Sequence, residues 1–305
     1  MKEFLIVLNK DEDSVSIVNL ENREESKRLD VGHNPHEIAI TPNGKKSYIT
    51  CSMGNQIDVM DNNDFEIVKT IKHEDFDFPH GVGCTDDGKK LYMASTYSER
   101  IFIIDTVEDE IVKHFPTHQK YSHMISFSPG GERVYVPNIG SNNITVIDTK
   151  KEEIIEHFPV GEGPEGIAVH HDAGELYVAN QKDNTLFVID TTNYEKLYER
   201  RLGSTPIRMV FSNDGKYAFI PNRESGDVSV IDTDFKPKEG PWEVKRIPVG
   251  TWPGGIVFDR EDRYAYVANN KTNDISIIDV EKLKEEPKRI DVGTHPDGIG
   301  YLMRE

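Results

Sequence analysis

The chain has 305 residues, of which 36% are hydrophobic and 30% are charged, a balance typical of a folded protein with a well-solvated surface. Its net charge of −18 argues against binding to nucleic acid or to an anionic membrane, because both attract clustered Lys and Arg. The two cysteines, Cys51 and Cys84, are too few for a disulfide framework.

The first residues, MKEFLIVLNKDED, contain only a short apolar run, which ends at Asn9. This run is too short for a secretory signal or a membrane span. We therefore expect a soluble, cytoplasmic protein. Export stays open, because a chain whose signal had been removed would look the same.

Seven copies of one strand pair follow each other along the chain. They are IVLNKDEDSVSIVN (6–19), YITCSMGNQIDVMD (48–61), YMASTYSERIFIID (92–105), YVPNIGSNNITVID (135–148), YVANQKDNTLFVID (177–190), FIPNRESGDVSVID (219–232) and YVANNKTNDISIID (266–279). In each copy the small or amide residue that ends the first strand lies ten residues before the closing Asp or Asn. This constant spacing indicates a tight turn that tolerates no insertion.

A further strand is expected on either side of each copy. The preceding strand leads into a hairpin turn such as TPNGKK (41–46), and the following strand has the form of EIVKTI (66–71). Four antiparallel strands of this size make one propeller blade. Three outer strands in 3–31 lack an innermost strand, and 295–302 is an innermost strand without partners. We therefore predict one all-β domain, residues 1–305, folded as a seven-bladed β-propeller whose two ends share one blade.

The segments YVPN (135–138) and YVAN (177–180 and 266–269), with the recurrent VID motif, resemble the YVTN-repeat β-propellers. That group is similar to the lactonase-type and cytochrome d1-type propellers. The resemblance covers essentially the whole chain and implies the fold, but members of the family include enzymes, cofactor binders and surface proteins. Cys51 and Ser95 stand where the family usually has Asn, and we expect those two turns to be built differently.

The first residue of each innermost strand is expected at the mouth of the central channel. Counting back twelve residues from the aromatic position gives this series: His36, His80, His123, Glu165, Ile207, Gly254 and Asp297. Three imidazoles and a carboxylate from consecutive blades form a ligand set that suits Zn, Fe or Mn. We predict that His36, His80, His123 and Glu165 hold such a divalent ion. The alternative is that the histidines only line a wet channel.

Other residues are expected around the same mouth. The turns that face it carry Tyr97, Lys182 and Arg223, and a loop that leads into an innermost strand carries Trp252. These four residues are predicted to bind the substrate. Arg208 is one place out of register, and a small bulge would turn it inward to bind an anionic substrate. Asp297 is predicted to act as a catalytic base or to orient an imidazole, and Glu165 is predicted to be catalytic as well as metal-binding.

Other chemical motifs are missing from the sequence, including a phosphate-binding glycine loop, a CxxC pair and a G-x-S-x-G elbow. We predict a metal-dependent enzyme, a hydrolase, lyase or oxygen-using enzyme, that acts on a small polar and possibly anionic substrate. Two alternatives stay open. One is a non-catalytic propeller that binds a ligand or a protein, and the other, which the resemblance allows, is a propeller with a histidine on haem iron. We make no prediction of the oligomeric state.

Overall fold

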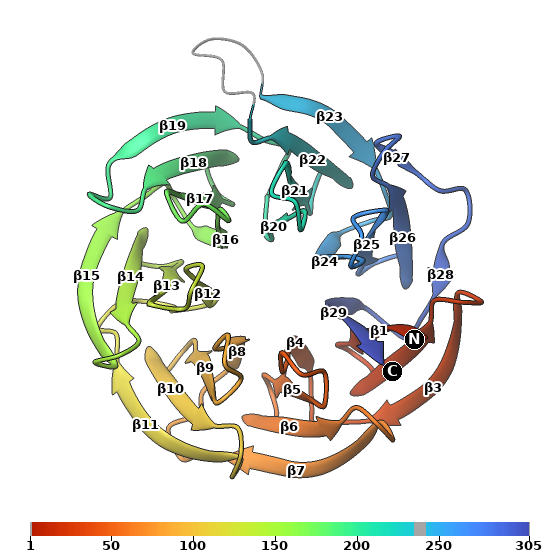
Figure 1. Ribbon diagram of the computed structural model, residues 1–305, viewed down its shortest axis with the longest axis horizontal. Helices are drawn as coiled ribbons and strands as arrows, with labels where there is room; N and C mark the ends of the chain where they lie inside the picture. Colours follow the sequence, from red (N-terminus) through yellow and green to blue (C-terminus); the bar gives the residue numbers. More distant parts are fainter. Residues whose placement is uncertain (1, 235–241, 305) are drawn as a thin grey trace.

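The computed structural model describes residues 2–234 and 242–304, which form seven antiparallel sheets around a central axis (Figure 1). Each sheet extends from an innermost strand beside the axis to an outermost strand at the circumference. The predicted seven-bladed all-β propeller is confirmed. No helix in the described part of the chain is long and apolar enough to cross a membrane.

The blades are numbered from the first one made by consecutive strands. Blade 1 consists of β4 (Pro35–Ile40), β5 (Lys46–Cys51), β6 (Gln56–Asp61) and β7 (Glu66–Lys72). Blade 2 consists of β8 (Pro79–Cys84), β9 (Lys90–Ser95), β10 (Arg100–Asp105) and β11 (Glu110–Pro116). Blade 3 consists of β12 (Ser126–Phe127), β13 (Arg133–Asn138), β14 (Asn143–Asp148) and β15 (Glu153–Pro159). Blade 4 consists of β16 (Pro164–Val169), β17 (Glu175–Asn180), β18 (Thr185–Asp190) and β19 (Lys196–Arg201).

The remaining blades include the one that closes the ring. Blade 5 consists of β20 (Val210–Phe211), β21 (Tyr217–Asn222), β22 (Asp227–Asp232) and β23 (Glu243–Pro248). Blade 6 consists of β24 (Pro253–Phe258), β25 (Tyr264–Asn269), β26 (Asp274–Asp279), β27 (Lys284–Glu285) and β28 (Ile290–Asp291). Blade 7 consists of β29 (Pro296–Arg304), β1 (Lys2–Asn9), β2 (Ser14–Asn19) and β3 (Glu24–Asp30).

The two ends of the chain meet in blade 7. Strand β29 pairs antiparallel with β1, from Lys2 opposite Arg304 to Asn9 opposite Pro296. The innermost strand of this blade therefore comes from the C-terminal end of the chain and its three outer strands from the N-terminal end (Figure 1). This is the closing arrangement that the sequence predicts, and it pairs strand edges that would otherwise be open.

The recurrent Asn explains the constant ten-residue spacing. Asn9 is fully buried, and its side-chain amide donates to the hydroxyls of Ser14 and Ser16 at 3.0 and 2.9 Å. Its Oδ1 accepts a hydrogen bond from the backbone N–H of Gly293 at 3.0 Å. One amide thus joins the turn to the approaching innermost strand. An insertion in the turn would move its hydroxyl partners out of reach.

The two turns without this Asn use other groups. Beside Cys51, the backbone N–H of Gly32 donates to Oδ2 of Asp58 at 2.7 Å, so a carboxylate replaces the missing amide oxygen. The Ser95 hydroxyl accepts from the backbone N–H of Asp77 at 2.8 Å. The expected difference in these turns is therefore present.

The hydrophobic core lies between neighbouring blades. The aromatic residue that opens a repeat packs against the next sheet. Tyr48 of blade 1, for example, shares a cluster with Met93 and Phe102 of blade 2. All three side chains are fully buried. Burial of such a side chain contributes about 1.5–3 kcal/mol, and the ring of sheets repeats the contact around the axis.

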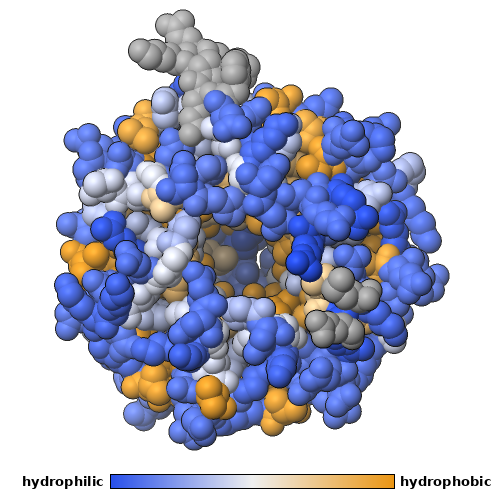
Figure 2. Space-filling model, in the orientation of Figure 1, coloured by the Kyte–Doolittle hydropathy of each residue, from blue (hydrophilic) through white to orange (hydrophobic). Residues whose placement is uncertain are grey.

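The face in Figure 2 is mostly hydrophilic and is open at its centre.

Candidate functional site

A β-bulge at the start of the innermost strand holds most of the predicted channel residues. In blade 1, Pro35 pairs with Cys51 and Glu37 pairs with Thr50, so His36 is an extra residue between them. Bulges bend a strand and change the direction of a side chain, which places these residues outside strict alternation. The same shift in register follows the prolines at the head of four other innermost strands, Pro79, Pro164, Pro253 and Pro296.

The three predicted histidines come together. The ring centroids of His36 and His80 are 4.4 Å apart, and the rings of His80 and His123 stack with centroids 3.6 Å apart and planes 22° apart. Burial lowers the pKa of His80 well below its usual range, and the nearby His123 lowers it further. Burial and the charge of Arg208 lower the pKa of His123 in the same way. Both rings are therefore neutral at neutral pH.

Asp297 lies beside the first of these rings. Its Oδ2 is 3.4 Å from Nε2 of His36 and accepts a hydrogen bond from the ammonium group of Lys10 at 3.1 Å. Burial raises the pKa of Asp297, but the hydrogen bond and charge of His36, with the charges of Lys10 and Arg208, hold it well below its usual range. Asp297 is therefore a buried carboxylate in contact with an imidazole, at 1% exposure.

Arg208 reaches across the channel. Its Nη1 donates to Oε1 of Glu165 in blade 4 at 2.8 Å, and its Nη2 donates to Glu37 in blade 1. Burial lowers the pKa of this guanidinium, but the carboxylates of Glu37 and Glu165 raise it above its usual value. The pairing register shifts by one residue here, as the sequence predicts. Pro206 lies opposite Asn222 and Val210 lies opposite Phe219, so four steps on this strand face three on β21. Arg208 lies within this irregular stretch and does not follow strict alternation.

Glu37 was missed by sequence reasoning, although a signal was present. It occupies the position after the channel residue, and four blades have glycine there, namely Gly81, Gly166, Gly255 and Gly298. A Cβ at Gly81 would lie 2.3 Å from the carbonyl oxygen of His123, so these glycines let the inner strands approach each other. Glu37 and Arg208 are oppositely charged exceptions in this glycine series. Burial raises the pKa of Glu37.

Four buried polar atoms of this cluster have no partner within the described residues. They are Nδ1 of His36, Nδ1 of His80, Nε of Arg208 and Oδ1 of Asp297. Buried polar atoms are nearly always hydrogen-bonded, so this set is completed by water or by a ligand. It offers both donors and an acceptor, which suits a small oxygen-rich molecule. We call His36, His80, His123, Arg208 and Asp297 the channel cluster.

The arrangement of the four predicted ligands does not fit a metal centre. The stacked rings of His80 and His123 keep their nitrogens in two nearly parallel planes, and the carboxylate of Glu165 is bonded to Arg208. Within the described residues, no group of three or more His, Cys, Asp or Glu side chains is placed to hold a metal ion. We derive no chemical step through a metal, and the predicted ion stays a prediction.

Apart from Arg208, the predicted substrate-binding residues lie outside this cluster. Tyr97 is 55% exposed and its ring centroid is 4.9 Å from that of Phe78. The guanidinium of Arg223 lies 5.8 Å from the ring centroid of Trp252. Lys182 is exposed, and its side chain lies over the turn at Gly163. Their roles stay predictions.

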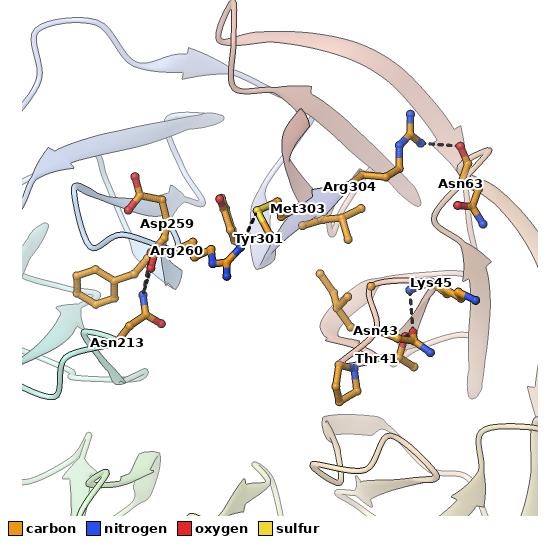
Figure 3. Close-up of a pocket in the computed structure, with 15 residues that line it drawn as sticks. Thr41, Asn43, Lys45, Asn63, Asn213, Asp259, Arg260, Tyr301, Met303 and Arg304 are labelled. Atoms are coloured by element: carbon orange, nitrogen blue, oxygen red, sulfur yellow. Dashed lines mark hydrogen bonds between the residues drawn. The ribbon is translucent and has the colours of Figure 1, made fainter. Parts of the chain in front are cut away.

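A pocket of about 660 Å³ lies at the other end of the innermost strands. It is lined in part by the turn after β4 and by the last residues of β29 (Figure 3). Two of its polar side chains have partners: Asn213 donates to the carbonyl of Asp259 at 2.8 Å, and the guanidinium of Arg304 donates to the carbonyl of Asn62 at 3.0 Å. No buried unpartnered atom recorded in the described chain belongs to its lining. The channel cluster is therefore the stronger candidate site.

Comparison with known proteins fits this architecture. The family described as "Lactonase, 7-bladed beta-propeller" matches residues 1–154 and 117–295. The chain belongs to this family. No curated protein sequence matches it.

Solved structures resemble this lactonase-family chain in fold. A hydrazine synthase structure from Kuenenia stuttgartiensis is 22% identical, with a TM-score of 0.83 over 90% of this chain and 92% of that chain. A periplasmic gluconolactonase from Pseudomonas aeruginosa is 17% identical, with a TM-score of 0.81 over 99% of each chain. A putative 6-phosphogluconolactonase from Bacteroides fragilis is 17% identical, with a TM-score of 0.79 over 99% of this chain and 98% of that chain.

Proposed function

We propose that the protein is a hydrolase that opens a small polar lactone at the channel cluster. The family makes an enzyme that acts on a small molecule the first hypothesis. The observation that carries the proposal is the set of four buried polar atoms without partners in the cluster. The carbonyl oxygen of a lactone accepts hydrogen bonds, so it can pair with the unpartnered donors of the cluster. The attacking water has protons to donate, so it can pair with the unpartnered acceptors.

In this proposal His36 is the general base. Its Nε2 faces Asp297 at 3.4 Å, so Nε2 carries the proton and Nδ1 keeps a free lone pair. Nδ1 takes a proton from water while the water oxygen bonds to the lactone carbonyl carbon. The carboxylate of Asp297 stabilises the imidazolium that forms, as the third member of a catalytic triad does.

The oxyanion of the tetrahedral intermediate would lie against Arg208 and His80. Nε of Arg208 carries a hydrogen and has no partner, and Nδ1 of neutral His80 supplies a second donor in one of its tautomers. The ring C–O bond then breaks, and the leaving oxygen takes the proton from His36 to give a hydroxy acid. Glu165 positions Arg208 through their 2.8 Å bond.

The test is proton release from lactones at constant pH, with Asp297→Asn and His36→Gln compared with wild type. We expect kcat to fall by about 10²–10⁴-fold in both variants, which is the usual contribution of a general base. The matched control is His33→Gln, because His33 also pairs with a carboxylate, Asp13 at 2.9 Å, but is exposed on the rim. Equal activity of His36→Gln and wild type would refute the proposal.

The predicted divalent ion is tested on the same preparation. Elemental analysis of protein purified without a metal column, followed by chelation, measures whether hydrolysis needs a metal. Activity that survives chelation supports the route through His36 and Asp297. About one metal per chain, with activity lost on chelation and restored by the ion, would support the metal-dependent mechanism instead.

We keep the cytoplasm as the expected compartment, which fractionation of cells tests.

A further inference from the structure

One side of the channel mouth carries a continuous series of aromatic rings. Tyr121 is 46% exposed, and its ring centroid is 5.7 Å from that of Tyr97, which lies 4.9 Å from Phe78. The ring of Phe78 is nearly parallel to that of His80, with centroids 5.9 Å apart and planes 12° apart. These rings lead from solvent down to the channel cluster. We call Phe78, Tyr97 and Tyr121 the aromatic wall.

Two rings of the aromatic wall stand on a backbone conformation that favours glycine. Phe78 and Tyr121 each have φ of 60°. Positive φ recurs at the equivalent position of the other blades, at Asn34, Gly163, Thr205, Trp252 and His295, so it belongs to the repeated turn. A side chain in this region is strained. The repeated turn therefore fixes the place of these rings, and the ring of Tyr121, 46% exposed, is accessible to a ligand at the mouth.

The other side of the mouth carries cations. The ammonium group of Lys271 lies 4.9 Å from the ring centroid of Trp252, and the guanidinium of Arg223 lies 5.8 Å from the same centroid. One indole therefore holds two positive charges side by side in a chain with a net charge of −18. The charge of Arg223 also lowers the pKa of His123, which places this cationic pair within electrostatic reach of the channel cluster.

We propose that the mouth selects a planar, anionic lactone, whose flat unsaturated ring packs on the aromatic wall and whose carboxylate binds Arg223 and Lys271. This inference rests on the proposed lactone hydrolysis and names the substrate class of the same site. A sugar lactone fits less well, because each of its hydroxyls needs a hydrogen-bond partner and the wall offers ring faces. A flat ring loses little entropy on stacking and removes apolar surface from water.

The inference is tested by binding alone, with 2-naphthoate as the probe and quenching of Trp252 fluorescence as the signal. The other tryptophan, Trp242, is 1% exposed, and a Trp252→Phe variant identifies the source of the signal. We expect naphthoate to quench and gluconate, an anion without a flat ring, to leave the signal unchanged. Equal binding of gluconate and naphthoate would overturn the inference.

Two matched pairs of variants assign the contacts. Tyr97→Ala is expected to weaken naphthoate binding roughly three- to tenfold, which corresponds to one aromatic contact. Its control is Met53→Ala, since Met53 occupies the same turn position in blade 1 and is 61% exposed. Arg223→Gln is expected to weaken binding to a similar extent, while Lys89→Gln, which removes the same charge at the other end of the blades, leaves binding unchanged. Wild-type affinity in Tyr97→Ala would overturn the inference.

The outcomes separate this inference from the proposed function. Naphthoate binding that depends on Tyr97, with no hydrolysis of any lactone, would overturn the hydrolase and leave the binding site for a planar anion in place. Hydrolysis of gluconolactone at a higher kcat/KM than coumarin-3-carboxylate, a planar lactone with a carboxylate, together with no naphthoate binding, would overturn the substrate class alone.

Discussion

Replacing Arg208 with Met tests whether the centre of the propeller is held by buried charge. The side chains of Arg208, Glu165 and Glu37 are 7, 6 and 13% exposed. The substitution leaves two carboxylates without their cation, and removal of one partner from a buried ion pair costs about 3–5 kcal/mol. With two carboxylates affected, we expect a loss of free energy of unfolding at the upper end, about 4–5 kcal/mol. Urea unfolding at neutral pH, followed by circular dichroism, measures it.

A matched control and a rescue variant define the cause. Arg28 also pairs with two carboxylates, Glu12 and Glu25, but its side chain is 38% exposed, so Arg28→Met is expected to cost less than about 1 kcal/mol. Neutralising Glu37 and Glu165 as Gln in the Arg208→Met background should restore at least half of the lost stability. If Arg208→Met costs no more than Arg28→Met, the guanidinium is not the buried centre of an ion-pair network.

Three further predictions concern packing, pH and closure. Gly81→Ala is expected to lower the melting temperature, because its Cβ would lie 2.3 Å from the carbonyl oxygen of His123. The control Gly174→Ala should be neutral, because the nearest atom to its Cβ would be 3.5 Å away. Equal melting temperatures of the two variants would contradict this prediction. Burial raises the pKa of Asp259 in the folded state, so the folded state keeps a proton that the unfolded chain loses. The free energy of unfolding therefore falls as pH rises from the pKa of this carboxyl in the unfolded chain to its pKa in the folded state. Asp259→Asn should therefore gain melting temperature relative to wild type at pH 7 and not at pH 3.5; a loss at pH 7 would contradict the sign. Removing residues 296–305 deletes β29 and opens the edge of β1, and size-exclusion chromatography should show aggregation where full-length protein does not.

The architecture was predictable because it depends on local spacing. The ten-residue step from Asn9 to Asn19 reflects bonds within one turn, and these bonds recur wherever the Asn recurs. The convergence of His36, His80 and His123 followed from the same repeat, since equivalent positions in neighbouring blades meet at the axis.

The chemistry inside the channel was less predictable, because it depends on contacts between distant blades. The bond from Arg208 to Glu37 joins residues 171 positions apart, and period-two alternation directed Arg208 outward. The one-residue shift in register between Pro206 and Val210 frees it to turn inward. The stacking of His80 on His123 is likewise set by how closely the inner strands approach at Gly81. No spacing in the sequence reports that distance.

The most direct test of the proposed site is a crystal structure of the Asp297→Asn variant with a bound lactone. The variant keeps the shape of the side chain and removes the carboxylate that supports His36, so substrate should accumulate unhydrolysed. We predict density at the channel cluster, with the lactone carbonyl oxygen within hydrogen-bond distance of Nε of Arg208 and the ring against the aromatic wall. Density instead in the pocket between the turn after β4 and the end of β29, with the channel cluster filled by water, would contradict the account.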